Sequence, residues 1–306
     1  MSERPDAFGS ADMQPRSTSW LRRLTAGGWE LYARPEWTSR AGPDWPTRIM
    51  HFESTGHFEA KQGRSTGRCV LDSAEGALVV YLKRHYRHPR WRGVLATFRP
   101  GHWSAGMHEY RQLRWASTHR IAVPRVLAAG EFVGPWGRMQ SFLAIEELTG
   151  MLPLDQAIPL ALRELAPEAF RKWKKGLALE LARVVRFLHE RNRFHKDLYL
   201  CHFFVRRSDT ARVPEWRNNI YMIDLHRFAH HPLTRTRWRS KDLGQLMFSS
   251  EIEGIGARDR LRFWRAYLAP DTDSRRWLRS IVLLRAERYR RHNAAMAARA
   301  QRGAAA

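Results

Sequence analysis

The sequence predicts an α+β fold of two lobes, in which a small β-rich N-terminal lobe precedes a larger helical C-terminal lobe. Two observations support this prediction. Between about residues 50 and 148, short apolar runs alternate with turn residues, which is typical of strands joined by tight connections. Beyond this region, apolar residues recur at helical spacing, most clearly at Leu177, Leu181, Val184, Val185 and Leu188.

The chain of 306 residues is long enough for two modest domains, and we divide it into four segments. Residues 1–50 are rich in Pro, Gly, Ser and Arg and are expected to form a mostly irregular, partly disordered lead-in. Residues 51–148 and 149–270 are expected to form the two lobes. The last segment, 271–306, is expected to contain one more helix followed by a basic Ala/Arg tail that frays.

Short-range patterns then predict the individual elements. In the N-terminal lobe these are a hairpin over 56–67, strands over 67–71 and 77–83, a helix over 104–117, a helix end and strand over 122–130, and an apolar strand over 141–148. In the C-terminal lobe, a long amphipathic helix covers 177–188 and leads directly into a polar loop. A further helix is predicted over 241–250.

Two polar segments in the C-terminal lobe have the order of a phosphoryl-transfer site. The first, His195-Lys196-Asp197, runs into an apolar strand at 203–205, and a second apolar strand, 220–223, ends at Asp224. Protein kinases show the same order of an H-R-D-x-x-x-x-N loop, a strand, a turn, a strand and the Asp of D-F-G. The pattern therefore predicts a protein-kinase-like fold, with Asp197 as the catalytic base and Asp224 as a Mg²⁺ ligand.

The individual residues of the two segments make this prediction more specific. Asp-Leu-Tyr-Leu-Cys-His-Phe at 197–203 and Ile-Asp-Leu-His-Arg at 223–227 resemble the lipopolysaccharide core kinases, which phosphorylate heptose or 3-deoxy-manno-octulosonic acid (Kdo) sugars of the inner core. The resemblance covers roughly residues 55–270 and includes the Lys-Asp-Leu…Phe-Ser-Ser run at 241–250. It implies an ATP- and Mg²⁺-dependent phosphotransferase that acts on an alcohol group. Lys196 stands where the family usually has Arg.

The implied mechanism assigns roles to three residues of these segments. Asp197 would accept a hydrogen bond from the sugar hydroxyl and orient it for attack. Asp224 would bind Mg²⁺. His202 falls where protein kinases place a metal-binding Asn, and it would either hold a second metal position or orient Asp197 or Asp224.

Three further residues are expected to support the site. His195 would bond backbone around the Asp224 turn, and Asp242 would brace the catalytic loop from below. Arg227, shortly after Asp224, would face the acceptor.

The nucleotide is expected to bind to the N-terminal lobe. Leu-Val-Val-Tyr-Leu-Lys at 78–83 has the form of the kinase strand V-A-I-K. Lys83 would therefore clamp the α- and β-phosphates of ATP, and Glu109 would keep Lys83 in place.

Other nucleotide contacts rest on weaker patterns. Backbone groups around Glu147 and Leu148, at the end of the last strand of the lobe, would meet the adenine edge. The segment from Gly63 to Gly67 is the nearest equivalent of a phosphate-covering loop, although it is not a G-x-G-x-x-G sequence. Its small residues would still permit close approach of backbone to phosphate.

The charge of the chain bears on its partners. It carries 53 Lys plus Arg against 30 Asp plus Glu, a net charge of +23, which attracts polyanions unless it only reflects Arg usage in a high-GC genome. The partners expected are a lipopolysaccharide core or lipid A-linked sugar acceptor and an anionic inner-membrane surface. Nucleic acid is not expected, because no zinc-finger, RRM or KH motif is present.

The composition also indicates in which cellular compartment the protein is expected. Two cysteines provide no disulfide framework, and no apolar stretch of about 18 residues or signal-like segment is present. The expected location is the cytoplasm, peripheral on the inner face of the inner membrane.

Three alternatives remain open at this point. A pseudokinase could bind anionic glycolipid as a scaffold without catalysis. A kinase of the same fold could act on an aminoglycoside, a choline-like alcohol or a protein, although Tyr199 stands where protein serine/threonine kinases usually carry Lys. A nucleic-acid binder would rest on charge alone.

Overall fold

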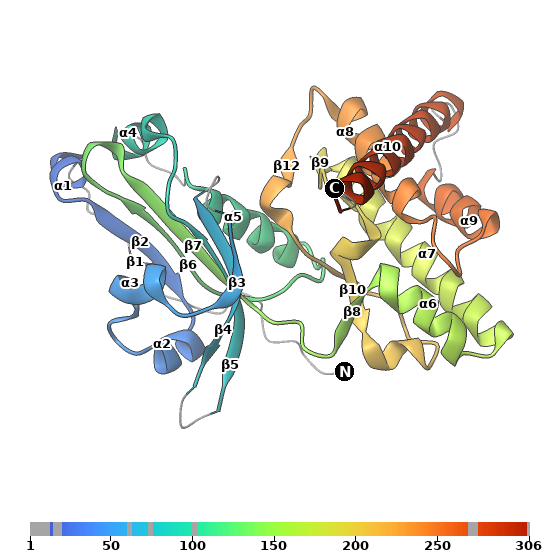
Figure 1. The fold of residues 1–306 in the computed structure, drawn as a ribbon, viewed down its shortest axis with the longest axis horizontal. Coiled ribbons are helices and arrows are strands. Elements are labelled where there is room, and N and C mark those ends of the chain that lie inside the picture. The colour runs from blue at the N-terminus through green and yellow to red at the C-terminus, as the bar shows by residue number, and fades with distance from the viewer. Residues whose placement is uncertain are drawn as a thin grey trace. The chain divides into compact units, whose positions relative to one another are not determined.

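The structure is a computed structural model that describes residues 13–14, 20–59, 63–72, 76–98, 103–268 and 275–304. The chain divides into two compact units, Met1–Leu148 and Thr149–Ala306. The first unit is built on one large sheet and the second is mainly helical, as the colours of Figure 1 allow the reader to follow. The predicted α+β class is therefore confirmed.

A seven-stranded antiparallel sheet forms the framework of the N-terminal unit, with the order β1-β2-β6-β7-β5-β4-β3. Its strands are β1 (Met13–Gln14), β2 (Gly28–Ala33), β3 (Thr55–Glu59), β4 (Arg64–Leu71), β5 (Leu78–His85), β6 (Val126–Val133) and β7 (Met139–Glu146). Alternating burial along β4 reflects the period of two that its sequence carries, with one face of the strand packed on the core. The predicted hairpin is confirmed by the pairing of β3 with β4.

Helices accompany this sheet among the described residues of the unit. They are α1 (Trp20–Thr25), α2 (Pro35–Ala41), α3 (Trp45–Arg48), α4 (Arg90–Phe98) and α5 (Ala105–Thr118). Helix α5, which was predicted, begins where the Ser104 hydroxyl accepts a hydrogen bond from the Met107 N–H and so caps the first turn. Its buried face, which includes Met107 and Leu113, packs against β6 and β7.

The expectation of an irregular lead-in over residues 1–50 is wrong for the described residues 20–50. Strand β2 pairs along its whole length with β6, and Trp37 and Ile49 are fully buried in the core of the unit. The average composition of the segment hid these few large apolar side chains. The core in which they are buried includes Leu127 and Phe142, much later in the chain, which the composition of the segment could not reveal.

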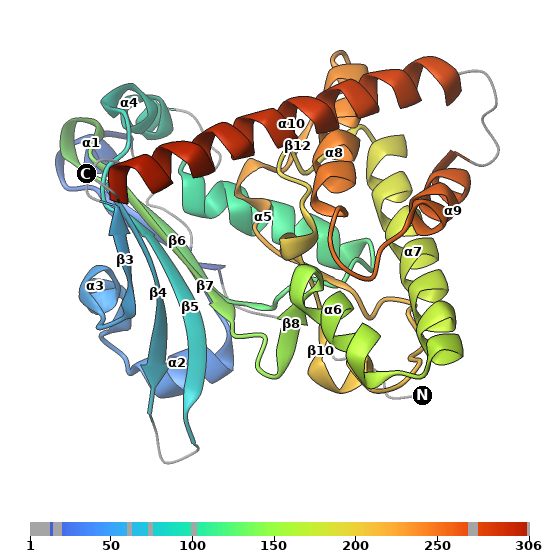
Figure 2. The same ribbon diagram turned by 45° about the vertical axis from the view of Figure 1, so that its right-hand side comes forward.

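The C-terminal unit consists of five helices and several short strands among its described residues. The helices are α6 (Leu154–Glu164), α7 (Pro167–Glu190), α8 (Arg235–Ser249), α9 (Ala257–Leu268) and α10 (Arg275–Ala304). The strands are β8 (Met151–Pro153), β9 (Arg193–Phe194), β10 (Phe203–Arg206), β11 (Tyr221–Met222) and β12 (Ala229–His230). Helix α7 packs on α9, and α8 packs on α10, as Figure 2 shows. The predicted helices over 177–188 and 241–250 are thus confirmed as parts of α7 and α8.

The expected fraying tail is also wrong, because α10 continues to Ala304 as one helix. Ala and Arg are strong helix formers, so the composition that suggested a tail is compatible with helix propagation. Leu278, Val282 and Ala286 are buried on one side of α10, which anchors the helix to its unit. Within the part of the chain that the structure describes, no helix is both long and apolar enough to cross a membrane.

Candidate active site

The catalytic loop predicted from sequence lies between β9 and β10 of the C-terminal unit. The Asp197 carboxylate is partly exposed there, and both of its oxygens face polar groups. Its Oδ1 accepts a hydrogen bond from Nε2 of Gln245 on α8 at 3.2 Å, and its Oδ2 lies 3.8 Å from Nη1 of Arg227. An amide therefore holds one carboxylate oxygen, and a guanidinium faces the other.

Asp242, also on α8, holds the backbone of this loop. It is fully buried, and its two oxygens accept the backbone N–H groups of His195 and Lys196, each at 2.8 Å. Nε2 of His189 lies 3.3 Å from the same oxygen that binds His195. Lys196 has a positive φ of 65°, a conformation that costs about 1–3 kcal/mol for a non-glycine residue. The charged acceptor beneath the loop stabilises this strained turn.

The second predicted carboxylate, Asp224, follows β11 and is also held in the left-handed region, with φ 60° and ψ 56°. Its Oδ1 accepts a hydrogen bond from Nδ1 of His226 at 2.7 Å. The carbonyl of the preceding residue, Ile223, lies 3.0 Å from Nε2 of the buried His195. Two strained non-glycine residues, Lys196 and Asp224, thus mark the two halves of the candidate site.

His202 connects these halves. Its Nδ1 donates to the backbone carbonyl of Asp197 at 2.6 Å, and its Nε2 lies 3.9 Å from Oδ2 of Asp224. Burial by itself lowers the pKa of His202, but the contacts with Cys201, the Asp197 carbonyl and Asp224 outweigh burial and raise it. The structure therefore brings Asp197, His202 and Asp224 together within one unit.

The surroundings of Asp197 are positively charged. Burial, followed by the nearby charge of Arg227, lowers the pKa of both Lys196 and Lys241. Lys241 also donates to the carbonyl of Lys196. A cationic environment of this kind suits an anionic substrate. Burial likewise lowers the pKa of His195, which favours a neutral ring that bonds backbone.

Two polar residues of the site were missed in the sequence analysis. Gln245 binds Asp197, and its Oε1 accepts the backbone N–H of Leu198 at 3.1 Å. His226 orients Asp224. One signal was present for Gln245, because it lies three residues after Asp242 on a predicted helix and therefore on the same face.

The N-terminal unit contains the predicted Lys–Glu pair. Nζ of Lys83, on β5, lies 2.7 Å from Oε1 of Glu109 on α5, and the Glu109 side chain is only 3% exposed. Strand β5 pairs with β4 on one side and with β7 on the other, so the backbone that carries Lys83 is fixed on both sides. The buried carboxylate positions the ammonium group at the sheet surface.

The predicted phosphate-covering segment is corrected by the structure. Residues 64–67 belong to β4, where Gly67 pairs with Gly56 and Leu82, so they form no loop. Gly63, with φ 58°, is the described end of the hairpin turn, and residues 60–62 lie outside the described residues. Glycine spacing suggested a loop here, whereas the register of the strands places these residues within the sheet.

The predicted adenine contacts are placed only in part. The Glu147 N–H donates to the Val79 carbonyl at 3.2 Å, so this backbone group is already engaged within the sheet. The Glu147 side chain forms a two-point ion pair with Arg68. Leu148 is half-buried and ends the first unit. The Glu147 carbonyl and the Leu148 backbone stay the predicted contacts of adenine.

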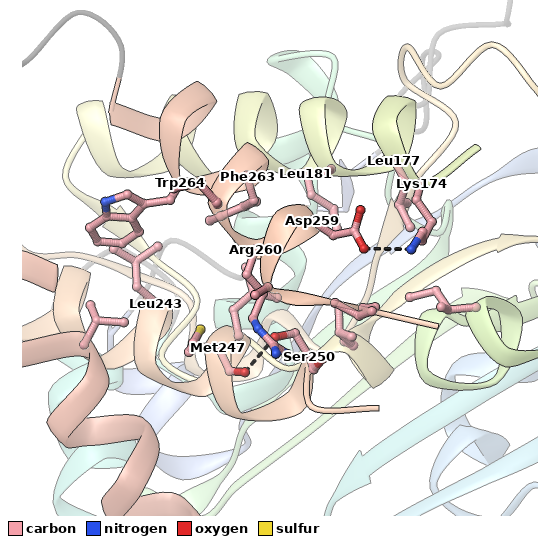
Figure 3. A pocket seen from close by; sticks show the side chains of 18 of the residues that line it. Lys174, Leu177, Leu181, Leu243, Met247, Ser250, Asp259, Arg260, Phe263 and Trp264 are labelled. Carbon is pink, nitrogen blue, oxygen red and sulfur yellow. Dashed lines mark hydrogen bonds and ion pairs between the residues drawn. The ribbon is translucent and has the colours of Figure 1, made fainter. Parts of the chain in front are cut away.

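An apolar cavity of about 460 Å³ lies among α7, α8, α9 and α10, and no sequence signal predicted it. Figure 3 shows its lining, which includes Leu177, Leu181, Leu243, Met247, Phe263 and Trp264. The polar groups at the edge are engaged with one another. Nζ of Lys174 lies 2.7 Å from Oδ2 of Asp259, and Nη1 of Arg260 donates to the Ser250 carbonyl at 3.1 Å.

A metal ion at this site would have few protein ligands. Among the described residues, no group of three or more His, Cys, Asp and Glu side chains lies close enough to hold an ion. Mg²⁺ commonly uses one or two carboxylates and completes its octahedron with water and substrate phosphates. The half-exposed Asp224 carboxylate suits such a site, whereas His202 offers a nitrogen, which Mg²⁺ binds less readily.

Comparisons with known proteins bear on the family and the fold. The family model described as the lipopolysaccharide kinase (Kdo/WaaP) family matches residues 53–267. The lipopolysaccharide core heptose(I) kinase WaaP of Pseudomonas aeruginosa is 33% identical over 174 residues, which are 57% of this chain and 61% of that protein. WaaP of Escherichia coli K12 is 36% identical over 127 residues, 42% of this chain and 46% of that protein. The chain thus spans less than two thirds of either relative.

Among solved structures, WaaP in complex with acyl carrier protein matches with a TM-score of 0.57 and 27% sequence identity, over 83% of this chain and 92% of that chain. The kinase-like fold and the resemblance inferred from the two central motifs are thereby confirmed. The chain belongs to the lipopolysaccharide kinase (Kdo/WaaP) family.

Proposed function

We propose that this protein is an ATP-dependent kinase that phosphorylates a heptose hydroxyl of the lipopolysaccharide inner core. The observation that supports this most directly is the convergence of Asp197 and Asp224, bridged by His202, in a chain of this family. Heptose is favoured over Kdo because the relatives are heptose(I) kinases. The activity is proposed to lie in the cytoplasm, on the inner face of the inner membrane.

The nucleotide is assigned to residues 51–148 and the acceptor to residues 149–270. Lys83, held by Glu109, would place its ammonium group on the α- and β-phosphates. Gly63, just before β4, would lie near the phosphates together with Gly67. Backbone groups at Glu147 and Leu148 would bind adenine through the carbonyl and not through the Glu147 N–H.

Asp224 would hold Mg²⁺, and His202 would either complete the metal site or keep Asp224 oriented. The ion would supply positive charge to the phosphate oxygens as the γ-phosphoryl group moves. His226 would keep the Asp224 carboxylate oriented through the hydrogen bond to one of its oxygens. Asp242 and His195 would keep both loops in place through their backbone contacts.

Asp197 would act on the acceptor. With Oδ1 bound to Gln245, Oδ2 would accept the proton of the sugar hydroxyl as its oxygen attacks the γ-phosphorus and the bond to ADP breaks. Arg227 would face the acceptor and would bind an oxygen or phosphate of the core.

The test is phosphate transfer from labelled ATP to purified, dephosphorylated core oligosaccharide. Asp197→Asn and Asp224→Asn should each lower the rate by about 100-fold or more, because a positioned base and a metal ligand each contribute at least that much. Glu168→Gln, on the exposed surface of α7, is the matched control and should be fully active. Full activity in either aspartate variant would refute the mechanism, and binding of MgATP without turnover by the unaltered protein would favour the scaffold alternative.

A second proposal concerns a protein partner. A similar solved structure is WaaP in complex with acyl carrier protein, and the C-terminal unit here contains an apolar cavity that could take a flexible hydrocarbon chain. We propose that this chain binds an acylated carrier protein and takes the acyl chain into that cavity. Acyl-loaded carrier protein should raise the melting temperature, and carrier protein without an acyl chain should not.

A matched pair of variants tests the cavity. Ala178→Trp would fill the cavity and should abolish the stabilisation, whereas Leu179→Trp, at the neighbouring exposed position of α7, should preserve it. Equal stabilisation of both variants would place the acyl chain elsewhere.

A further inference from the structure

One surface of the N-terminal unit gathers exposed apolar side chains from three elements. We call it the aromatic face, and it consists of α1, α4 and the 3₁₀ turn Pro135–Gly137. Its side chains are between 39% and 70% exposed, and they are Trp20, Leu21, Trp91, Val94, Phe98 and Trp136. Figures 1 and 2 both show α1 and α4 side by side at one end of the sheet. A gathering of this size marks an interaction site more often than scattered single residues do.

The packing of the three elements is specific. A Cβ atom on Gly93 of α4 would lie 2.2 Å from the Gly137 carbonyl oxygen, so only glycine lets the helix and the turn meet at backbone distance. Between α1 and α4, the rings of Trp20 and Phe98 pack with their centroids 5.7 Å apart. The α4 helix and the turn therefore meet at backbone distance, and one ring pair links α1 to α4.

Trp136 is the most exposed of these residues and the most strained. It has φ 52° and ψ 37°, a left-handed conformation that is a rare outlier for a bulky residue. Backbone hydrogen bonds from Gly134 to the Arg138 carbonyl and from Arg138 to the Pro135 carbonyl close the turn around it. The fold thus holds a large aromatic ring in solvent at a conformational cost, a feature that is frequent at binding sites.

The charge around the aromatic face has one sign. The elements that form it, residues 20–25, 90–98 and 135–137, contain no Asp or Glu. Arg87, Arg90 and Arg92 lie in or just before α4, and the Arg92 guanidinium lies 5.3 Å from the ring centroid of Trp91. The nearby Glu131 is fully buried, where it accepts the N–H groups of Trp103 and Ser104.

We propose that the aromatic face is a docking surface for an anionic lipid bilayer. Tryptophan rings favour the membrane interface, because one end is apolar and the other donates a hydrogen bond, and arginines next to them attract acidic headgroups. A twofold contact with a second copy is disfavoured, because it would bring the same arginines together. The inference concerns attachment only, and it is independent of the proposed phosphate transfer.

The test is flotation of the full chain with vesicles of phosphatidylcholine alone or with 30% phosphatidylglycerol. Binding should require the anionic lipid and weaken in high salt. Trp20→Ser/Trp91→Ser/Trp136→Ser should lower the partition coefficient about tenfold or more. Arg90→Gln/Arg92→Gln should lower it about fivefold for each charge removed. Trp277→Ser/Leu284→Ser, at exposed positions of α10, is the matched control and should bind normally.

Two measurements separate docking from folding and from catalysis. Trp136→Gly removes the ring and relieves the left-handed strain, so it should remain folded and still bind vesicles more weakly. All variants should phosphorylate a soluble, delipidated acceptor at the rate of the unaltered protein. Vesicle binding that is unchanged in the triple tryptophan variant, or that is indifferent to anionic lipid, would overturn the proposal. Loss of self-association or of carrier-protein binding in that variant, without loss of vesicle binding, would assign the face to that partner instead.

Discussion

Gln245 offers the sharpest test of how the proposed base is positioned. The residue is 2% exposed, and its amide makes three contacts. Nε2 donates to Asp197 Oδ1 at 3.2 Å and to the Tyr199 hydroxyl at 3.1 Å, and Oε1 accepts the Leu198 N–H. Gln245→Leu keeps the volume of the side chain and removes all three. Asp197 would then keep its charge but lose the group that fixes its orientation.

The expected loss follows from these contacts. A hydrogen bond to a charged group contributes about 1.5–3 kcal/mol, so loss of the Asp197 contact should lower kcat about 10- to 100-fold. The substitution also leaves the buried Leu198 N–H without its acceptor, and this loss should lower the free energy of unfolding by about 1–3 kcal/mol. Because Asp197 remains present, the rate loss should stay below that of Asp197→Asn.

The assay is phosphate transfer to core oligosaccharide as a function of pH, with urea unfolding of the same samples. Gln245→Glu is the informative companion, because a second carboxylate beside Asp197 should shift the acidic limb of the kcat profile to higher pH. Gln156→Leu, on the exposed side of α6, serves as the control. If Gln245→Leu lost stability but kept kcat and its pH profile, Gln245 would be only a structural residue and the reasoning would be refuted.

Three further predictions follow from single contacts. Asp242→Asn leaves one acceptor oxygen for the two backbone N–H groups of the loop. Urea unfolding should therefore show a free energy of unfolding lower by about 1.5–3 kcal/mol, and kcat should fall as well. Unchanged stability would contradict the bracing role. Glu109→Gln should lower kcat/KM for ATP about 10- to 100-fold, measured against exposed Glu168→Gln; an unaffected value would separate Lys83 from nucleotide binding. Burial, then Arg92, lowers the pKa of His88 from 6.5 to about 4, so its neutral form stabilises the fold above pH 6.5, and this contribution is lost as pH falls towards 4. His88→Gln should therefore remove about 2 kcal/mol of the stability difference between pH 7.5 and pH 5, and an identical pH dependence in the variant would exclude this assignment.

The catalytic segments were accessible from sequence because their chemistry requires given residue types at short, regular spacing. Asp197 precedes one short apolar strand, β10, and Asp224 follows another, β11. The two strands pair with each other in the structure. The Lys83 strand and the Glu109 helix were predicted in the same way, from local periodicity. The pairing of Lys83 with Glu109 was inferred from the kinase order, and the structure brings the two side chains together at 2.7 Å.

Errors arose where an element depended on a distant partner. Trp37 and Ile49 were interpreted as parts of an irregular segment, but they are buried in a core that includes Leu127 and Phe142. Gly67 resembled a loop glycine, but register with Leu82 places it within a strand. Local composition carries no information about which strand will lie alongside, so these assignments required the assembled sheet.

By itself, the sequence determined the order of the site, namely a loop aspartate, a strand, a turn and a second aspartate, together with the family that this order identifies. Only the tertiary structure decided which groups hold those aspartates, where an apolar cavity opens among four helices, and which aromatic rings share one surface. The physical reason is one of range. Backbone preferences and side-chain periodicity act over a few residues and can be read along the chain, whereas the contacts of Gln245, the cavity and the aromatic face join residues whose proximity results from packing.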